Sequence, residues 1–301
     1  MAEVLPAPLI FDRSLLRLRR RRAAVLGPAI FLLDRAAGDL ADRLGAVLRR
    51  FPLALDLGTP TDAVRAALAR LGSVETIVAA DFAATPGHAL AFVAADEEAL
   101  PFRDAAFDLV VSGLSLQFVN DLPGTLVQVR RALKPDGLFV AALVGGESLT
   151  ELRQSFAAAE SETEGGISPR VAPLPDLRDL GGLLQRAGFT LPVVDSDRIT
   201  VRYDSVFDLM HDLRRMGAAN ALTERRRTPL RRPTLMRMAE IYGERFRNDD
   251  GRLRATFEIV WLSGWAPHPS QQQPLRPGSA KARLADALGA QEMSTGEKAG
   301  D

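Results

Sequence analysis

Three apolar segments of the chain each run into an aspartate. They are "LALDLG" (53–58), "ETIVAAD" (75–81) and "ALAFVAAD" (89–96). Helical patterns alternate with segments of this kind, and near-continuous apolar strands alternating with helices are typical of a parallel sheet covered on both faces. In such a sheet, ligands bind outside the carboxyl ends of the strands. The sequence therefore predicts an α/β fold in which Asp56, Asp81 and Asp96 gather at a ligand-binding edge.

The residue types at this edge suit a nucleoside. An acid at the end of the second strand can accept hydrogen bonds from both ribose hydroxyls, and Asp81, followed by Phe82, has that place. Asp96 and Glu97, after the third strand, can accept from an adenine amino group. Gly58 has no Cβ and lets the backbone come close to a ligand. One such aspartate alone would more often cap a helix, but three at successive strand ends predict a nucleotide-like ligand.

The turn after the first strand argues against a ligand with phosphates. A dinucleotide site of the G-x-G-x-x-G type places a pyrophosphate on a helix amino terminus. Here the turn reads Gly58-Thr59-Pro60-Thr61-Asp62, so the later glycines are missing and Asp62 would repel a phosphate. This turn favours S-adenosyl-L-methionine (SAM) as the cofactor, because SAM carries adenosine and a zwitterionic amino acid but no phosphate.

Four segments are expected along the chain. Residues 1–50 form an N-terminal helical segment, broken at Gly27-Pro28, and residues 51–146 form a SAM-binding, Rossmann-like core. Residues 147–270 form a helical insertion plus the last strands that complete the sheet, and residues 271–301 form a mostly disordered tail. Helices are predicted at 62–72, 121–133, 145–166, 177–189, 205–219 and 233–247, and later strands at 107–118, 138–145, 193–203 and 254–266. The segment "KPDG" (134–137) is predicted to be a turn.

Composition excludes several kinds of site. The chain has no cysteine, which removes disulfides, thiolate nucleophiles and cysteine-ligated metals. The three histidines, at 88, 211 and 268, show no metal-ligand spacing, so no metal site is predicted. Lys+Arg 38 balances Asp+Glu 38, so no overall field favours nucleic acid. No run reaches the roughly 18–20 apolar residues of a membrane helix, so no integral membrane segment is expected.

Arginine is the dominant basic residue, since lysine occurs only at 134, 281 and 298. The run Arg19 to Arg22 is interpreted as the solvated face of a helix whose apolar side carries Leu15, Leu16, Leu18 and Val25. The basic stretch 225–232 is either a solvated loop or a docking surface for an acidic partner. The beginning of the chain does not have the charge order of a secretory signal. The expected location is the bacterial cytoplasm, with a peripheral position at the inner membrane as an alternative, and the oligomeric state stays open.

Several longer stretches resemble one protein family. "FPLALDLG", "ADEEALPF", "FDLVVSGLSLQFVNDLPGTLVQVRRALKPDGLF" and "GGESLTELRQSFAAAESETEGGISPRVAP" resemble the class I SAM-dependent methyltransferase superfamily. More narrowly, they resemble the complex I assembly factor 5 (arginine hydroxylase) group, which is related to the malonyl carrier-protein methyltransferases. The likeness covers most of residues 11 to 280. It implies a seven-stranded, Rossmann-like sheet with SAM bound by Asp56, Gly58, Thr59, Asp81, Phe82, Asp96, Glu97, Ser112 and Leu114.

Two departures from the family pattern bear on function. The family turn reads Gly-Cys-Gly-x-Gly where this chain has Pro60 and Asp62, and its His-Trp pair is replaced by Gln117 and Phe118. The adenosine half of the site is thus kept while the methionine half is altered, so weakened or lost SAM binding is one hypothesis. The leading hypothesis is modification of a protein substrate, by arginine hydroxylation of a respiratory complex I subunit. The alternatives are a methyltransferase acting on a small acid or carrier-bound acyl group, and a non-catalytic assembly chaperone. No catalytic residue is identified.

Overall fold

The computed structural model describes residues 9–82, 91–173, 177–272 and 289, and the structural statements below concern these residues. The chain divides into two compact units, Met1–Pro267 and His268–Asp301. Every helix and strand named below belongs to the first unit. The predicted disordered tail lies almost entirely outside the described residues.

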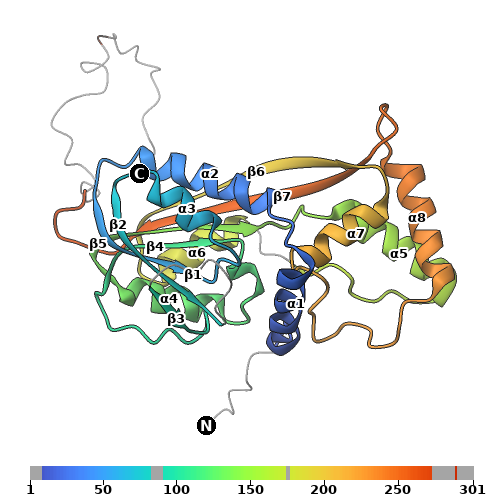
Figure 1. Ribbon diagram of the computed structural model, residues 1–301, viewed down its shortest axis with the longest axis horizontal. Helices are drawn as coiled ribbons and strands as arrows, with labels where there is room; N and C mark the ends of the chain where they lie inside the picture. The colour runs from blue at the N-terminus through green and yellow to red at the C-terminus, as the bar shows by residue number, and fades with distance from the viewer. Residues whose placement is uncertain (1–8, 83–90, 174–176, 273–288, 290–301) are drawn as a thin grey trace, which may run out of the picture. The chain divides into compact units, whose positions relative to one another are not determined.

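A seven-stranded sheet forms the centre of the first unit, in the order β3-β2-β1-β4-β5-β7-β6 (Figure 1). Its first five strands in chain order pair in parallel. They are β1 (Phe51–Leu57), β2 (Val74–Asp81), β3 (Phe92–Ala94), β4 (Phe107–Gly113) and β5 (Leu133–Val144). Their carboxyl ends therefore meet at one edge of the sheet. The predicted seven-stranded, Rossmann-like fold is confirmed.

The last strand of the chain lies inside the sheet. β7 (Leu253–Trp265) sits between β5 and β6 (Thr190–Tyr203) and pairs antiparallel with both. β6 and β7 span 14 and 13 residues, about twice the length of β1. Figure 1 shows them running past the parallel strands towards the helices of the insertion. These two strands therefore connect the parallel part of the sheet to the helices of the insertion.

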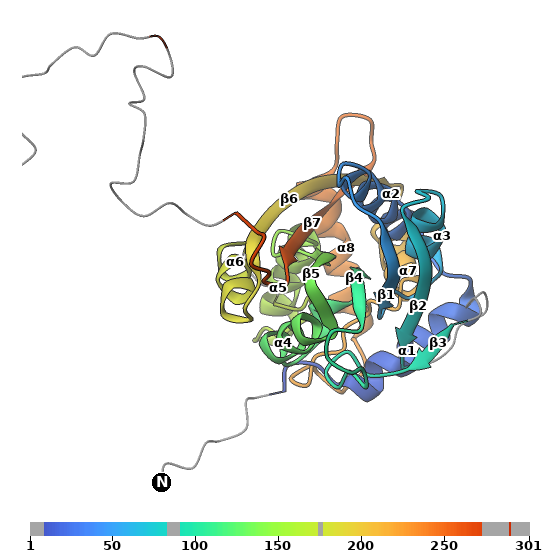
Figure 2. The ribbon, with the colours of Figure 1, turned by 90° about the vertical axis from the view of Figure 1, so that its left-hand side faces the viewer.

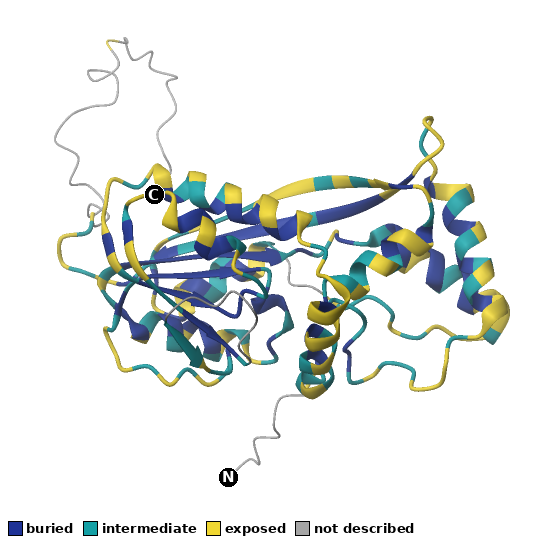
Figure 3. Cartoon of the chain, in the orientation of Figure 1, coloured by how far each residue is buried: buried dark blue, intermediate teal, exposed yellow. Residues whose placement is uncertain are grey.

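Helices cover both faces of the sheet, and each face has its own hydrophobic core (Figure 2). Side chains of β1 alternate between the two cores, with Ala54 in one and Leu55 in the other. The helices α2 (Phe31–Gly45), α3 (Ala63–Ala69), α5 (Thr150–Glu164), α7 (Val206–Arg215) and α8 (Arg232–Phe246) contribute to the first core. The helices α4 (Leu122–Ala132) and α6 (Leu177–Arg186) contribute to the second. Figure 3 shows that the outward faces of these helices are exposed.

The N-terminal helix α1 (Arg13–Leu26) departs from the predicted pattern. It begins after Asp12, whose carboxylate accepts a hydrogen bond from the Leu15 amide (2.9 Å), and it ends just before Gly27. The interpretation of its arginines as a solvated face is only partly right. Val25 is 88% exposed, whereas the arginine at position 20 is 9% exposed. Part of the basic face of α1 therefore points into the protein.

The turn expected at 134–137 lies within β5. Phe107 of β4 pairs with Leu133, and Leu109 pairs with Leu138, so four residues of β5 face one residue of β4. Asp136 has a φ of 62°, in the left-handed region. The "KPDG" segment is thus a bulge that shifts the register of the two strands.

Candidate functional site

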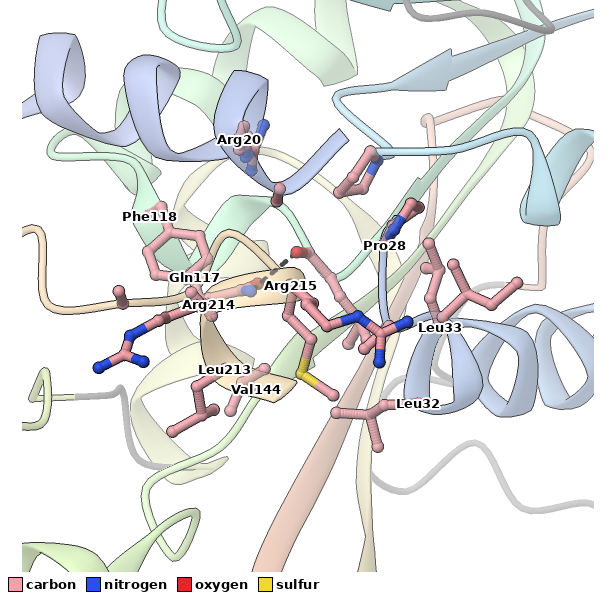
Figure 4. Close-up of a pocket in the computed structure, with 18 of the residues that line it drawn as sticks. Arg20, Pro28, Leu32, Leu33, Gln117, Phe118, Val144, Leu213, Arg214 and Arg215 are labelled. Atoms are coloured by element: carbon pink, nitrogen blue, oxygen red, sulfur yellow. Dashed lines mark hydrogen bonds between the residues drawn. The ribbon is translucent and has the colours of Figure 1, made fainter. Parts of the chain in front are cut away.

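A cavity of about 1040 Å³ opens at the carboxyl ends of the parallel strands (Figure 4). Its wall is mostly apolar and comes from α1, α2, the turn after β1, the loop after β4, α5, α7 and the segment after α7. Charged side chains also face it, namely Arg20, Arg21, Asp34, Asp62, Arg70, Asp81, Arg170, Arg214 and Arg215. A mainly apolar wall with a few charged groups is typical of a ligand pocket.

Three of the predicted binding residues line this cavity: Asp81, Phe82 and Leu114. Leu114, directly after β4, has a φ of 51°, and its amide donates to the Ala142 carbonyl at 2.9 Å. The other predicted residues are not part of the wall; they are Asp56, Gly58, Thr59, Asp96, Glu97 and Ser112. The predicted set is therefore divided between the cavity wall and residues outside it, which are buried except for the half-buried Asp96.

The turn after β1 is closed by contacts within the protein. Asp56 is buried, accepts a short hydrogen bond from Thr59, and forms an ion pair with Arg65 of α3 at 2.6 Å. Gly58 has a φ of 70°, and a Cβ on it would lie 2.5 Å from the Ser115 Oγ and 2.7 Å from a carboxylate oxygen of Glu97. Gly58 thus permits the close approach of two protein side chains, those of Ser115 and Glu97.

Arginines of α1 reach the acids that follow β3. Arg13 pairs with Asp96 at 2.8 Å and makes a shorter ion pair with Glu97, and Arg17 makes a short ion pair with Asp96. Glu97 is fully buried and also accepts from the Ser115 hydroxyl at 2.9 Å. Burial alone would raise the pKa of Glu97, but Arg20 and Arg13 outweigh it and hold that pKa below its ordinary value. Both predicted adenine acceptors are therefore charged and already paired.

Arg20 occupies the centre of this cluster. Its Nη2 donates to the Ser115 Oγ at 3.1 Å, and its Nη1 lies 3.5 Å from Glu97 Oε1 and 3.7 Å from Asp81 Oδ1. The guanidinium carbon lies 5.7 Å from the ring centroid of Phe82 and 6.0 Å from that of Phe118. Figure 4 shows Arg20 entering from α1 and Phe118 below it. A planar cation therefore sits between the acids and the aromatic rings.

Asp81 should make stability depend on pH. Burial raises the pKa of Asp81 to about 7, because the charge of Arg20 compensates only in part and Glu97 adds a like charge. A carboxyl with a raised folded-state pKa binds more protons folded than unfolded. Its contribution to the free energy of unfolding is therefore largest below about pH 4 and falls until about pH 7, by at most about 1.4 kcal/mol per pH unit.

We expect Asp81→Asn to remove this decline, as measured by chemical denaturation across that pH range. The control is Asp104→Asn, a substitution of a side chain that is 65% exposed, which should leave the decline in place. Parallel stability profiles for the wild type and Asp81→Asn would contradict the assigned pKa.

Sequence reasoning missed one set of residues, and it named one further residue only as a departure from the family pattern. The missed set is Arg13, Arg17 and Arg20, whose i, i+4, i+7 spacing places them on one helix face and was the available signal. The further residue is Gln117, which is 5% exposed and lines the cavity. Its Nε2 donates to the Leu114 carbonyl at 2.8 Å, and within the described residues its Oε1 has no hydrogen-bond partner. Gln117 therefore offers a buried acceptor to a ligand.

Comparison with known proteins identifies the family. A family model described as a methyltransferase domain matches residues 55–141. Arginine-hydroxylase NDUFAF5, mitochondrial, from Danio rerio is 41% identical over 287 residues, which cover 92% of this chain and 89% of that protein. The Homo sapiens protein of the same name is 43% identical over 284 residues, or 90% of this chain and 81% of that one. The chain belongs to the NDUFAF5 arginine-hydroxylase family. The predicted resemblance is confirmed, as is the prediction of an enzyme with a methyltransferase domain.

Relatives outside this family share less of the chain. A malonyl-[acyl-carrier protein] O-methyltransferase from Xylella fastidiosa (strain M23) is 39% identical over 178 residues, or 59% of this chain and 58% of that protein. The crystal structure of a candidate methyltransferase from Bacillus halodurans C-125 matches with a TM-score of 0.52 at 17% identity, covering 76% of this chain and 98% of that chain. This structural likeness shows the fold alone.

The predicted location is wrong. The family members that cover nine-tenths of this chain are mitochondrial proteins of eukaryotes, which contradicts the expectation of a bacterial cytoplasmic protein. The physical reason is that charge balance and the lack of cysteine constrain the chemistry of a chain but not its compartment. In the part of the chain that the structure describes, no helix is long and apolar enough to cross a membrane.

Proposed function

We propose that this chain hydroxylates an arginine side chain of a protein substrate, and that the substrate is a subunit of respiratory complex I. The observation that carries the proposal is the extent of the likeness to the arginine hydroxylases, at least 90% of this chain in the zebrafish and human proteins. That extent reaches well beyond the methyltransferase match at 55–141, into the helices α5 and α7 that complete the cavity wall.

The cavity has a group suited to an arginine side chain. Asp62, at the start of α3, lines the cavity, is exposed, and makes no side-chain cap hydrogen bond to its helix. A carboxylate can accept two parallel hydrogen bonds from a guanidinium. We therefore assign Asp62 the role of holding the substrate guanidinium. This role would also account for an acid at a position where the family pattern has glycine.

The reaction needs an oxidant and a reductant. Hydroxylation breaks a C–H bond of arginine and forms a C–O bond. With dioxygen as the oxidant, one oxygen atom enters the substrate, the other leaves as water, and a reductant supplies two electrons and two protons. Within the described residues, no group of three or more His, Asp or Glu side chains is arranged to hold a metal ion.

The space around the Arg20 guanidinium at the strand ends, between Asp81, Phe82, Glu97, Ser115 and Phe118, is called the crevice below. In the arrangement of this structure, the crevice does not fit the adenosyl group of SAM. Arg20 lies against Asp81, the carboxylate that would accept from the ribose hydroxyls. Asp96 and Glu97, the candidate adenine acceptors, are bound by the arginines of α1. We therefore assign no reaction step to SAM.

The proposed function predicts an arginine modification that depends on this chain. Deleting the gene should remove an added oxygen atom from one arginine of a complex I subunit, as detected by mass spectrometry of the purified complex. The wild-type gene should restore the modification. Asp62→Asn should restore it poorly, because an amide lacks the charge that pairs with guanidinium, whereas the surface control Asp104→Asn should restore it fully. Intact modification and intact complex assembly in the deletion strain would contradict the proposal, and lost assembly with intact modification would indicate a chaperone.

Methyl transfer to a carrier-bound acyl group is the second candidate. It is favoured by the malonyl carrier-protein relatives and by Arg21, Arg70 and Arg214, which line the cavity, are exposed and could bind a carboxylate. Incubation of the purified chain with radiolabelled SAM and a malonyl carrier protein tests it. Label on the acyl group would support this candidate, and its absence under conditions where SAM binds would dispose of it.

A further inference from the structure

Arg20 satisfies the hydrogen-bonding groups of the crevice with its own guanidinium. The side chain is almost fully buried on α1 and touches Ser115, Glu97 and Asp81 at 3.1, 3.5 and 3.7 Å. Its guanidinium carbon lies within 6.0 Å of the ring centroids of Phe82 and Phe118. Such distances are those of cation–π contacts. Acceptors and aromatic faces thus converge on one planar group.

An adenosine would need the same groups. Adenine is planar, stacks on aromatic side chains and donates through its amino group, and ribose donates two hydroxyls to a carboxylate. In this chain the aromatic faces are those of Phe82 and Phe118, and the carboxylates are those of Asp81 and Glu97. The guanidinium of Arg20 and an adenosyl group would therefore use the same carboxylates and aromatic faces, so the two groups cannot occupy the crevice together.

We propose that Arg20 is a built-in competitor of the adenosyl group, and that the crevice takes SAM only when this side chain turns out into the cavity. Room for that movement exists, because Arg20 already lines the cavity of about 1040 Å³. Arg20 would act in this way whichever acceptor the chain modifies. A failure of the test below therefore leaves the proposed hydroxylation untouched.

The helix itself can stay in place while Arg20 moves. Arg13 and Arg17, one to two turns earlier on the same face, hold α1 to Asp96 and Glu97. Their contacts are at most 2.8 Å, whereas those of Arg20 with the two nearest carboxylates are 3.5 and 3.7 Å. The ion-pair distances of Arg20 are thus the longest of the three arginines. The proposed movement therefore breaks the contacts of Arg20 with Ser115, Glu97 and Asp81 and leaves those of Arg13 and Arg17 in place.

The test is calorimetric titration of the full chain with SAM. Arg20→Ala should bind SAM at least about ten-fold more tightly than the wild type, because a hydrogen bond to a charged group no longer has to be broken. The affinity of Arg20→Ala for adenosine, which is neutral, should rise by a similar factor. The matched control is Arg22→Ala, an exposed arginine of the same helix outside the cavity wall, which should leave both affinities unchanged.

Three results would overturn the proposal. The first is that folded Arg20→Ala binds SAM no better than the wild type. The second is that Arg20→Ala binds SAM more tightly but adenosine no more tightly than the wild type does. That result would indicate that the substitution relieves charge repulsion and does not free a position that adenosine needs. The third is a crystal structure of the wild type with SAM in which adenine occupies the crevice while Arg20 still contacts Glu97 and Ser115. Should Arg20→Ala not fold, Arg20→Gln replaces it in the titrations with the same expectations.

Discussion

Arg65→Ala is expected to lower the free energy of unfolding by about 3–5 kcal/mol, because it leaves a buried carboxylate without its partner. The carboxylate is that of Asp56, which lies 2.6 Å from Arg65, and neither side chain is more than 8% exposed. Burial raises the pKa of Asp56 to about 6 even with Arg65 present. Removing Arg65 raises that pKa further, so Asp56 becomes easier to protonate. The difference in the free energy of unfolding between Arg65→Ala and the wild type should therefore shrink as the pH falls.

Urea denaturation at neutral and acidic pH measures this effect. The matched control is Arg131→Ala, since Arg131 and Asp104 form an ion pair in which both side chains are more than half exposed. That variant should lose less than about 1 kcal/mol. The double variant Asp56→Asn, Arg65→Met should recover much of the loss, because neither charge remains. A loss below about 1 kcal/mol for Arg65→Ala would show that the pair contributes no more than a surface contact.

Gly58→Ala is expected to cost about 3 kcal/mol, from left-handed strain and from overpacking together. Gly58 has a φ of 70°, and the new Cβ would lie 2.5 Å from the Ser115 Oγ and 2.7 Å from Glu97 Oε1. Glu97 is fully buried and cannot retreat without disturbing its ion pair with Arg13. The substitution should therefore strain the turn and loosen the attachment of α1 together.

The variant Gly72→Ala separates backbone strain from overpacking. Gly72 has a φ of 66°, but a Cβ there would meet nothing within 4 Å. It should lose only about 1 kcal/mol, from backbone strain. The midpoints of chemical denaturation measure the loss of stability in both variants. Equal losses would show that a Cβ at position 58 does not clash with Ser115 and Glu97.

The sheet was predictable because its signal is local. The apolar runs that became β1, β2, β4 and β5 need only their own residues to be recognised, and the carboxyl-edge position of Asp81 follows from the end of its run. The order of the strands is set by contacts between distant segments and was not predicted; only the seven-stranded, Rossmann-like type of sheet was expected, through the family resemblance. The "KPDG" bulge was mistaken for a turn because its shape depends on the register between β4 and β5.

The site was less predictable because its partners are far apart in the chain. Arg13 and Asp96 are 83 residues apart, and Arg20 and Ser115 are 95 apart. Periodicity can place Arg13 and Arg20 on one face of a helix, but it does not say whether that face meets water or carboxylates. Three of nine predicted binding residues line the cavity, because acids at strand ends can point into a pocket or be neutralised behind it.

The interior position of β7 has a consequence for biosynthesis. β7 is the last regular element of the first unit, yet it separates β5 from β6. While the ribosome is still adding residues before 253, the far side of β5 has no neighbouring strand, and β6 cannot reach its final place. An open strand edge invites pairing with other chains. We therefore expect a chain truncated before residue 253 to be prone to aggregation, because β5 then has an open edge and β6 has no strand to pair with.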